Sequence, residues 1–276
     1  MRPNMQNSSI VRIVFIGDVV GKPGRRILEK HLFQVKIKYK PDVVIANGEN
    51  SAGGLGITEK TAKELFGAGV DFLTGGNHMW DKRESIGFLE NSRDIIRPMN
   101  YPDTAPGKGS CEFKINDEIT ITIANLQGRV FMEPVVDNPF NSVEKWLEKV
   151  RTKIVILDFH AEATAEKQAM GFFLDGKVSA VLGTHTHVPT ADLRILANGT
   201  AYQSDVGMTG SLDSVIGMKR KPVIDKFRTG INQRWEVAKK NVISDMAILD
   251  IDSKTGRTVK VEYLRIFEDK VTDQLK

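Results

Sequence analysis

Short apolar runs alternate along the chain with segments whose apolar residues recur at helical spacing. The runs are rich in Val and Ile, and they cover residues 10–16 (IVRIVFI), 42–46 (DVVIA), 70–73 (VDFL), 119–124 (ITITIA), 154–159 (IVILDF) and 178–182 (VSAVL). Short, nearly continuous apolar runs are typical of strands that are covered on both faces. We therefore expect each run to form a buried strand.

Helices are predicted between these strands. Residues 25–38, residues 141–151 and, less regularly, residues 58–66 carry apolar side chains at the spacing of one helix face. Asn141 or Ser142 is the expected N-cap of the middle one of these segments, because both side chains can accept hydrogen bonds from a first helical turn. Alternation of strands and helices favours an α/β fold with the helices outside the sheet.

The last third of the chain has a different pattern. Three further strands are expected with little helix between them, over residues 200–203 (TAYQ), 244–251 (SDMAILDI) and 259–266 (VKVEYLRI). This pattern predicts a second sheet that contains antiparallel strands. Residues 210–228 are interpreted as a loop. Its basic cluster, Lys219, Arg220 and Lys221, is interpreted as a solvated or subunit-facing surface, with phosphate binding as the alternative. The predicted fold is an α/β sandwich of two sheets flanked by helices.

Composition places the protein among ordinary soluble globular chains. The start, MRPNMQNSSI, lacks the apolar core of a secretory signal, so we expect residues 1–10 to be a disordered polar leader and residues 11–276 a single domain. No stretch approaches the run of about 20 apolar residues that a membrane helix requires. The single cysteine, Cys111, excludes an internal disulfide and fits a reducing compartment, so a cytoplasmic location is expected.

The net charge excludes few partners. Lys and Arg outnumber Asp and Glu by 39 to 35, which gives a formal charge of +4. The excess is too small and too scattered to indicate nucleic-acid binding, although it would not repel a substrate that carries phosphate. Whether the chain forms a homo-oligomer stays open.

Polar side chains capable of binding metal follow five of the apolar runs. Each stands just past the carboxyl end of its run: Asp18, Glu49 and Asn50, Asn77 and His78, His160, and His185 and His187. In open α/β sheets, ligand crevices lie at that edge. A single member of this set has an ordinary explanation, such as a helix cap for Asp18 or a core histidine for His160. Five such coincidences together favour a functional site.

The residue types narrow the chemistry of this site. Carboxylates, amide oxygens and imidazoles without thiols suit Mn, Fe, Zn or Co. Seven candidate ligands, which are Asp18, Glu49, Asn50, Asn77, His160, His185 and His187, exceed the four that a structural zinc typically takes. Two metal ions that share a bridging carboxylate would use them all. Such a pair, about 3.5–4 Å apart, can grip a phosphate and activate a bridging hydroxide for in-line attack.

His78 is the one residue of this set that is not a candidate ligand, and it lies next to the candidate ligand Asn77 in the sequence. It could donate a proton to a leaving alkoxide or stabilise the transition state. Trp80 and Asp81, which follow it in the stretch GGNHMWD, are expected to pack and to cap after the loop. His31 falls inside a predicted helix and is assigned a structural role.

These motifs, in this order, resemble the calcineurin-like metallophosphoesterase superfamily. Gly76-Asn77-His78 resembles its Gly-Asn-His motif, and Gly183-Thr184-His185-Thr186-His187 resembles its terminal His-x-His motif. Two departures, Asp18-Val19-Val20 without a histidine and Gly48-Glu49-Asn50, are typical of its bacterial YmdB-like branch of phosphodiesterases. The stretches FIGDVVGKPGR, ANGENSAGGLGIT, DFHAEATAEKQAMG and SDVGMTG also resemble that branch. The resemblance implies the four-layer architecture of the superfamily, two sheets between layers of helices.

The resemblance also implies roles for the candidate residues. Glu49 would bridge two metal ions. One ion would also be held by Asp18, Asn50 and His187, and the other by Asn77, His160 and His185. His78 would act as proton donor, and iron or manganese would be the metals, with zinc still open on donor type alone.

The implied activity is hydrolysis of a small phosphodiester. We expect a dinuclear phosphodiesterase that opens cyclic nucleotides, of the 2′,3′ class. The alternative is a regulatory protein that binds a nucleotide or a phosphoprotein at the same metal site with little turnover. Other metal hydrolases fit poorly, since amidohydrolase-like barrels place His-x-His after their first strand, whereas here it comes late.

Overall fold

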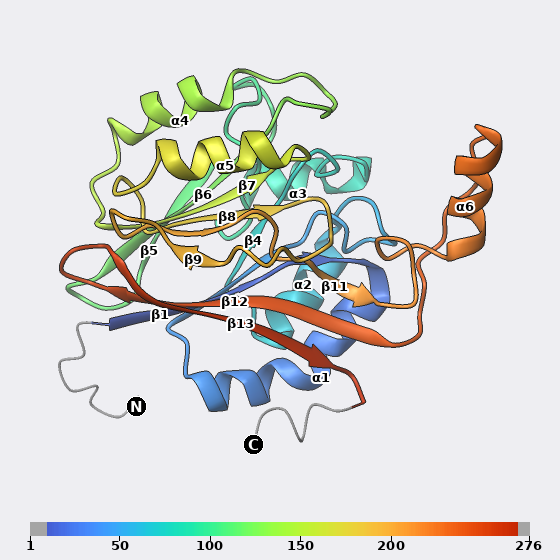
Figure 1. Ribbon diagram of the computed structural model, residues 1–276, viewed down its shortest axis with the longest axis horizontal. Helices are drawn as coiled ribbons and strands as arrows, with labels where there is room; N and C mark the ends of the chain where they lie inside the picture. The colour runs from blue at the N-terminus through green and yellow to red at the C-terminus, as the bar shows by residue number, and fades with distance from the viewer. Residues whose placement is uncertain (1–9, 270–276) are drawn as a thin grey trace.

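Two β-sheets lie face to face, and helices cover the outer face of each (Figure 1). This computed structural model describes residues 10–269. The predicted leader, residues 1–10, lies outside the described part except for Ile10, which is the first residue of a strand. The α/β sandwich predicted from the sequence is confirmed, while the assignment of residues 11–276 to one domain stays a prediction.

The first sheet has seven strands in the order β2-β11-β12-β1-β3-β4, with β13 paired to β12. Their bounds are β1 Ile10–Ile16, β2 Asp18–Val19, β3 Val43–Asn47, β4 Phe72–Thr74, β11 Met208–Ser211, β12 Val242–Asp252 and β13 Thr258–Phe267. Strands β1, β3 and β4 run parallel, so their carboxyl ends point to one edge.

The second sheet has six strands in the order β5-β6-β7-β8-β10-β9. Their bounds are β5 Ser110–Lys114, β6 Thr120–Gln127, β7 Ile154–His160, β8 Ala180–Thr184, β9 Arg194–Ile195 and β10 Ala201–Gln203. The four central strands β6, β7, β8 and β10 are parallel, and they too bring their carboxyl ends to one edge.

The helices complete the outer layers. They are α1 Gly21–Tyr39, α2 Glu59–Ala68, the 3₁₀ turn η1 Arg83–Ser85, α3 Ile86–Asn91, α4 Pro139–Leu147, α5 Thr164–Phe173 and α6 Arg220–Thr229. Helices α4 and α5 lie on one side of the two sheets and α1 on the other, while α6 projects from the body (Figure 1). Among residues 10–269, no helix is both long and apolar enough to cross a membrane.

Three apolar layers hold these elements together. Alternate residues of a strand face opposite sides of its sheet, so that each buried strand serves two layers. In β1, Phe15 packs between the sheets with Ile156 and Leu182, whereas Val14 and Ile16 face the apolar stripe of α1. On the far side, the outer face of the second sheet packs against α4 and α5. The order helix, sheet, sheet, helix is the predicted four-layer arrangement.

The sheet membership predicted for the last third of the chain is wrong. Strands β12 and β13 belong to the first sheet, where β12 pairs antiparallel with β1 from Ile10↔Asp252 to Ile16↔Met246. The physical reason is that both faces of β12 are apolar, since Met246 faces α1 while Ala247 faces the other sheet. Such a strand requires a central position. Of the three strands predicted there, only residues 200–203 (TAYQ) contribute to the second sheet, where residues 201–203 form β10.

Two local predictions also need correction. The N-cap of α4 is Asn138, not Asn141 or Ser142, because Pro139 favours the first helical position and the Asn138 side chain accepts hydrogen bonds from the next turn. Of residues 210–228, interpreted as a loop, residues 210–211 end strand β11 and residues 220–228 lie in α6. By contrast, the helix predicted to start at residue 58 is confirmed at that end. Thr58 is the N-cap of α2 and forms a capping box with Thr61.

Replacing Phe15 with Ala tests the layer between the sheets. The side chain is fully buried, so the lost contacts and the remaining cavity are expected to lower the free energy of unfolding by about 3–5 kcal/mol. Urea denaturation measures the loss. Phe227→Ala is the control, because Phe227 on α6 is 80% exposed and its removal should change stability by less than about 0.5 kcal/mol. Equal losses in the two variants would contradict the layer assignment.

Candidate metal centre

All eight residues singled out from the sequence lie where parallel strands end. Asp18 is separated from β1 by Gly17 and begins β2, while Glu49 and Asn50 follow β3, and Asn77 and His78 follow β4 in the first sheet. His160 is the last residue of β7, and His185 and His187 follow β8 in the second sheet. The two sheets therefore contribute side chains to one place.

One group of these side chains surrounds the ring of His160. Its Nε2 atom lies 3.0 Å from Glu49 Oε1, 3.1 Å from Asn77 Oδ1 and 3.1 Å from His185 Nδ1. Ligand atoms of Glu49, His160 and His185 all lie within 4.8 Å of one another, so these three residues can hold a metal ion.

A second group surrounds the ring of His187. Its Nε2 atom lies 3.2 Å from Asn50 Nδ2 and 3.6 Å from Asp18 Oδ1. Glu49 joins the two groups, because its Oε1 atom accepts a hydrogen bond from Asn50 Nδ2 at 3.3 Å and also faces His160. The carboxylate of Glu49 thus lies between the two sets of side chains.

The contacts of these buried atoms fit divalent cations. Asp18 is fully buried, and its Oδ1 atom accepts no hydrogen bond from the described residues, which is costly for a carboxylate. Three acceptors face Nε2 of His160, which can carry at most one proton. Cations bound between the two groups would satisfy acceptors that hydrogen bonds within the chain leave unpaired.

The pKa values of these side chains reflect the same crowding of acceptors. Burial by itself lowers the pKa of His160, but the adjacent Glu49 carboxylate raises it to about 9. Burial, together with the positive charge of His160, lowers the pKa of His185 to about 3. Burial raises and the charge of His187 lowers the pKa of Asp18, and the net shift is downward. A proton on His160 therefore occupies the position where its Nε2 would bind metal, and metal binding would release that proton.

A buried hydrogen-bond chain behind the site fixes the orientation of His160. Thr184 Oγ1 donates to Asp158 Oδ1 at 2.6 Å and lies 2.9 Å from His160 Nδ1. The hydroxyl of Thr184 has a single proton, which it uses in the hydrogen bond to Asp158. Thr184 Oγ1 is therefore the acceptor of the hydrogen bond that Nδ1–H of His160 donates. Nε2 then faces the other candidate ligands. In many metal sites, a hydrogen bond to the second ring nitrogen orients the histidine in the same way.

Gly76 allows the loop after β4 to approach this centre. A Cβ atom on Gly76 would lie 2.3 Å from Glu49 Oε2 and 2.4 Å from His160 Nε2, so no larger residue fits without displacing them. The close approach lets the backbone N–H of His78 donate to Glu49 Oε2 at 3.0 Å. Met79, which follows, is buried in the core, and Trp80 packs beside that core, as predicted.

His78 stands at the exposed rim of the centre. Its side chain is 32% exposed, its Nδ1 lies 2.8 Å from Asp81 Oδ2, and its Nε2 lies 3.3 Å from Asn77 Nδ2. The carboxylate of Asp81 thus orients the ring, a role that differs from the packing and capping expected of it. The spacing of three residues within one tight turn was the signal that could have identified this pair.

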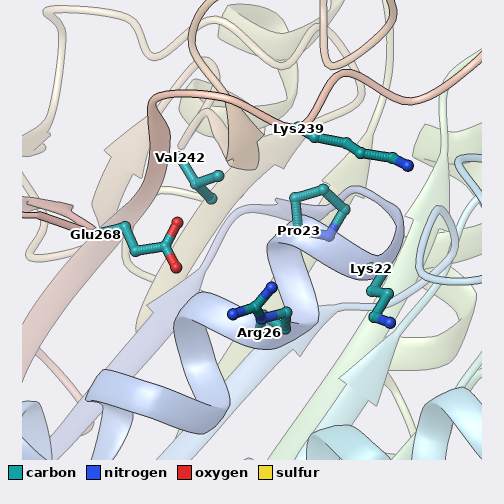
Figure 2. Close-up of a pocket in the computed structure, with 6 residues that line it drawn as sticks. All are labelled: Lys22, Pro23, Arg26, Lys239, Val242 and Glu268. Atoms are coloured by element: carbon teal, nitrogen blue, oxygen red, sulfur yellow. The ribbon is translucent and has the colours of Figure 1, made fainter.

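Other polar features lie apart from the centre. A pocket beside the first turn of α1 is lined by Lys22, Pro23, Arg26, Lys239, Val242 and Glu268, and none of the eight candidate residues lines it (Figure 2). In the basic cluster, Lys219 pairs with Glu236 and Lys221 pairs with Asp225 on the surface. His31 lies within α1, as expected for a structural role.

Comparison with known proteins places the chain in a family. A model described as "YmdB-like protein" matches residues 14–264. The chain is 46% identical over 261 residues to the 2′,3′-cyclic-nucleotide 2′-phosphodiesterase of Bacillus subtilis, which covers 94% of this chain and 98% of that protein. A crystal structure described as a novel phosphatase from Mycoplasma pneumoniae has a TM-score of 0.91 at 37% identity and covers 98% of both chains.

A second crystal structure, of a hypothetical protein from Thermus thermophilus, has a TM-score of 0.87 at 40% identity and covers 93% of this chain and 99% of that chain. The family match and these relatives extend over nearly the whole chain. The resemblance inferred from the motifs is thereby confirmed, and the protein belongs to the YmdB-like protein family.

Proposed function

We propose that this protein is a metal-dependent phosphodiesterase that opens cyclic nucleotides, of the 2′,3′ class. The observation that carries the proposal is the pair of ligand groups joined at Glu49, at the edge where both sheets end. The name of the Bacillus subtilis relative supports the reaction and the substrate class.

The two groups suggest how two divalent ions would be held. One ion would bind Asp18, Asn50, His187 and Glu49, and the other Asn77, His160, His185 and Glu49. A mixture of carboxylate, amide and imidazole ligands suits iron or manganese, and it also suits zinc. When bound, such a pair of ions supplies positive charge for the phosphate oxygens and makes a water molecule a stronger nucleophile.

The side chains of the protein would do the remaining work. His78 is partly exposed beside Asn77, at the rim of the centre. Its Nε2 could therefore contact a bound substrate, whereas the metal ligands are more deeply buried. Asp81 accepts from Nδ1 and orients the ring, so that Nε2 is the atom that would pass a proton to the departing alkoxide. The donor would thereby neutralise the charge that develops as the ring of the cyclic phosphate opens.

A panel of substrates tests this proposal. With metal-loaded protein we expect turnover of 2′,3′-cyclic nucleotides to exceed that of 3′,5′-cyclic nucleotides, a generic diester and a monoester. Metal analysis of the same sample should give two equivalents per chain. Tight nucleotide binding without hydrolysis would instead favour a regulatory binding protein. The cytoplasmic location stays a prediction.

Replacing His78 with Ala tests the proton donor. Because the side chain is not assigned to metal, the variant should keep both equivalents of metal while kcat falls by about 10²–10⁴-fold. Asp81→Asn should lower kcat by less, since the ring remains but is held by a neutral partner. Asp18→Ala is the contrast, because it should lose metal together with activity. Full turnover by His78→Ala would refute the assignment.

A further inference from the structure

The loop that carries His185 and His187 has an unusual backbone. The φ angle is 99° at His185 and 63° at His187, both in the left-handed region that residues with a Cβ rarely adopt. A residue held there is strained, so surrounding contacts must impose the conformation. Those contacts decide where two of the candidate ligands point.

A buried ion pair supplies these contacts. Lys167 of α5 and Asp205, which lies between β10 and β11, are both almost fully buried, and Lys167 Nζ lies 2.8 Å from Asp205 Oδ2. The ammonium also donates to the backbone oxygen of Thr184 at 2.8 Å, just before His185. Asp205 Oδ2 accepts from the backbone N–H of Thr186 at 3.0 Å, between the two histidines.

The same carboxylate reaches the other side of the centre. Asp205 Oδ1 accepts from the backbone N–H of Gly207 at 2.9 Å, and the oxygen of Gly207 accepts from the N–H of Asp18 at 3.1 Å. The N–H of His185 in turn donates to Asp18 Oδ2 at 3.1 Å. A closed set of hydrogen bonds thus connects Lys167, the histidine loop and Asp18.

Stability alone does not account for a pair of this kind. Removing two charges from water is costly, and apolar replacements of buried pairs are often neutral or stabilising. What Lys167 and Asp205 provide beyond mutual attraction is a set of directed bonds to backbone atoms beside His185, His187 and Asp18.

We propose that Lys167 and Asp205 are positioning residues that hold His185, His187 and Asp18 in the geometry that binds metal. Their hydrogen bonds beyond the pair itself go to backbone atoms and not to the ligand atoms, so they act through that backbone. The inference rests on the proposed metal site and is independent of which phosphodiester is cleaved.

The double variant Lys167→Met/Asp205→Asn tests the proposal by calorimetric titration of metal-free protein with Mn²⁺. We expect Mn²⁺ affinity to fall about 10–100-fold, which is the usual effect of losing a residue that hydrogen-bonds to the metal-binding residues and orients them. Lys167→Arg keeps a charged donor and should recover part of the affinity. Binding of Mn²⁺ by the unaltered protein is measured first, because its failure would refute the metal site itself rather than this inference.

A second ion pair provides a matched control. Arg12 binds Asp250 at 2.6 Å and the backbone oxygen of Tyr39 at 2.8 Å, at the opposite end of β1 from Asp18. Arg12→Met/Asp250→Asn should lower the melting temperature while leaving Mn²⁺ affinity unchanged. If the Lys167 and Asp205 variant binds Mn²⁺ as tightly as this control, the proposal is wrong. If the double variant does not fold, Asp205→Asn alone decides: unchanged Mn²⁺ affinity overturns the proposal, and weakened affinity supports it.

Discussion

The apolar layer between the two sheets is the interaction on which the rest of the structure depends. Neither sheet carries a complete set of ligand-type side chains, since Asp18, Glu49 and Asn77 come from one and His160 and His185 from the other. Packing of residues such as Phe15 against Ile156 brings the carboxyl ends of both sets of strands to one edge. The distances of 3.0 and 3.1 Å around His160 are therefore set by the apolar packing between the sheets.

The sequence predicted much of this arrangement for a simple reason. A buried strand between two layers has to be apolar on both faces, so its pattern and its end are visible in one dimension. The polar residue that follows it has to lie at the sheet edge, and this rule identified all eight residues that the structure gathers there. Motifs such as Gly-Asn-His then indicated how those residues divide between two groups.

What the sequence did not reveal depends on contacts between distant segments. Asp158 stands inside an apolar run, and only its bond to Thr184 in the neighbouring strand shows that it supports His160. Lys167 looks like an ordinary helix residue until α5 packs over the end of β8. The sheet to which β12 belongs was wrongly predicted because a pattern shows that both faces are buried but not which strand lies beside it.

The absence of a Cβ atom at Gly76 limits which substitutions this centre can accept. Glu49 and His160 are fully buried, so neither can move aside for a new methyl group. A change to Ala, the smallest available, would push on residues from both sheets at once. Glu49 and His160 already fill the space that a side chain at this position would need, so the missing Cβ is as much a component of the centre as its side chains. Substitutions elsewhere in the loop are compatible with the centre only where they leave these two side chains in place.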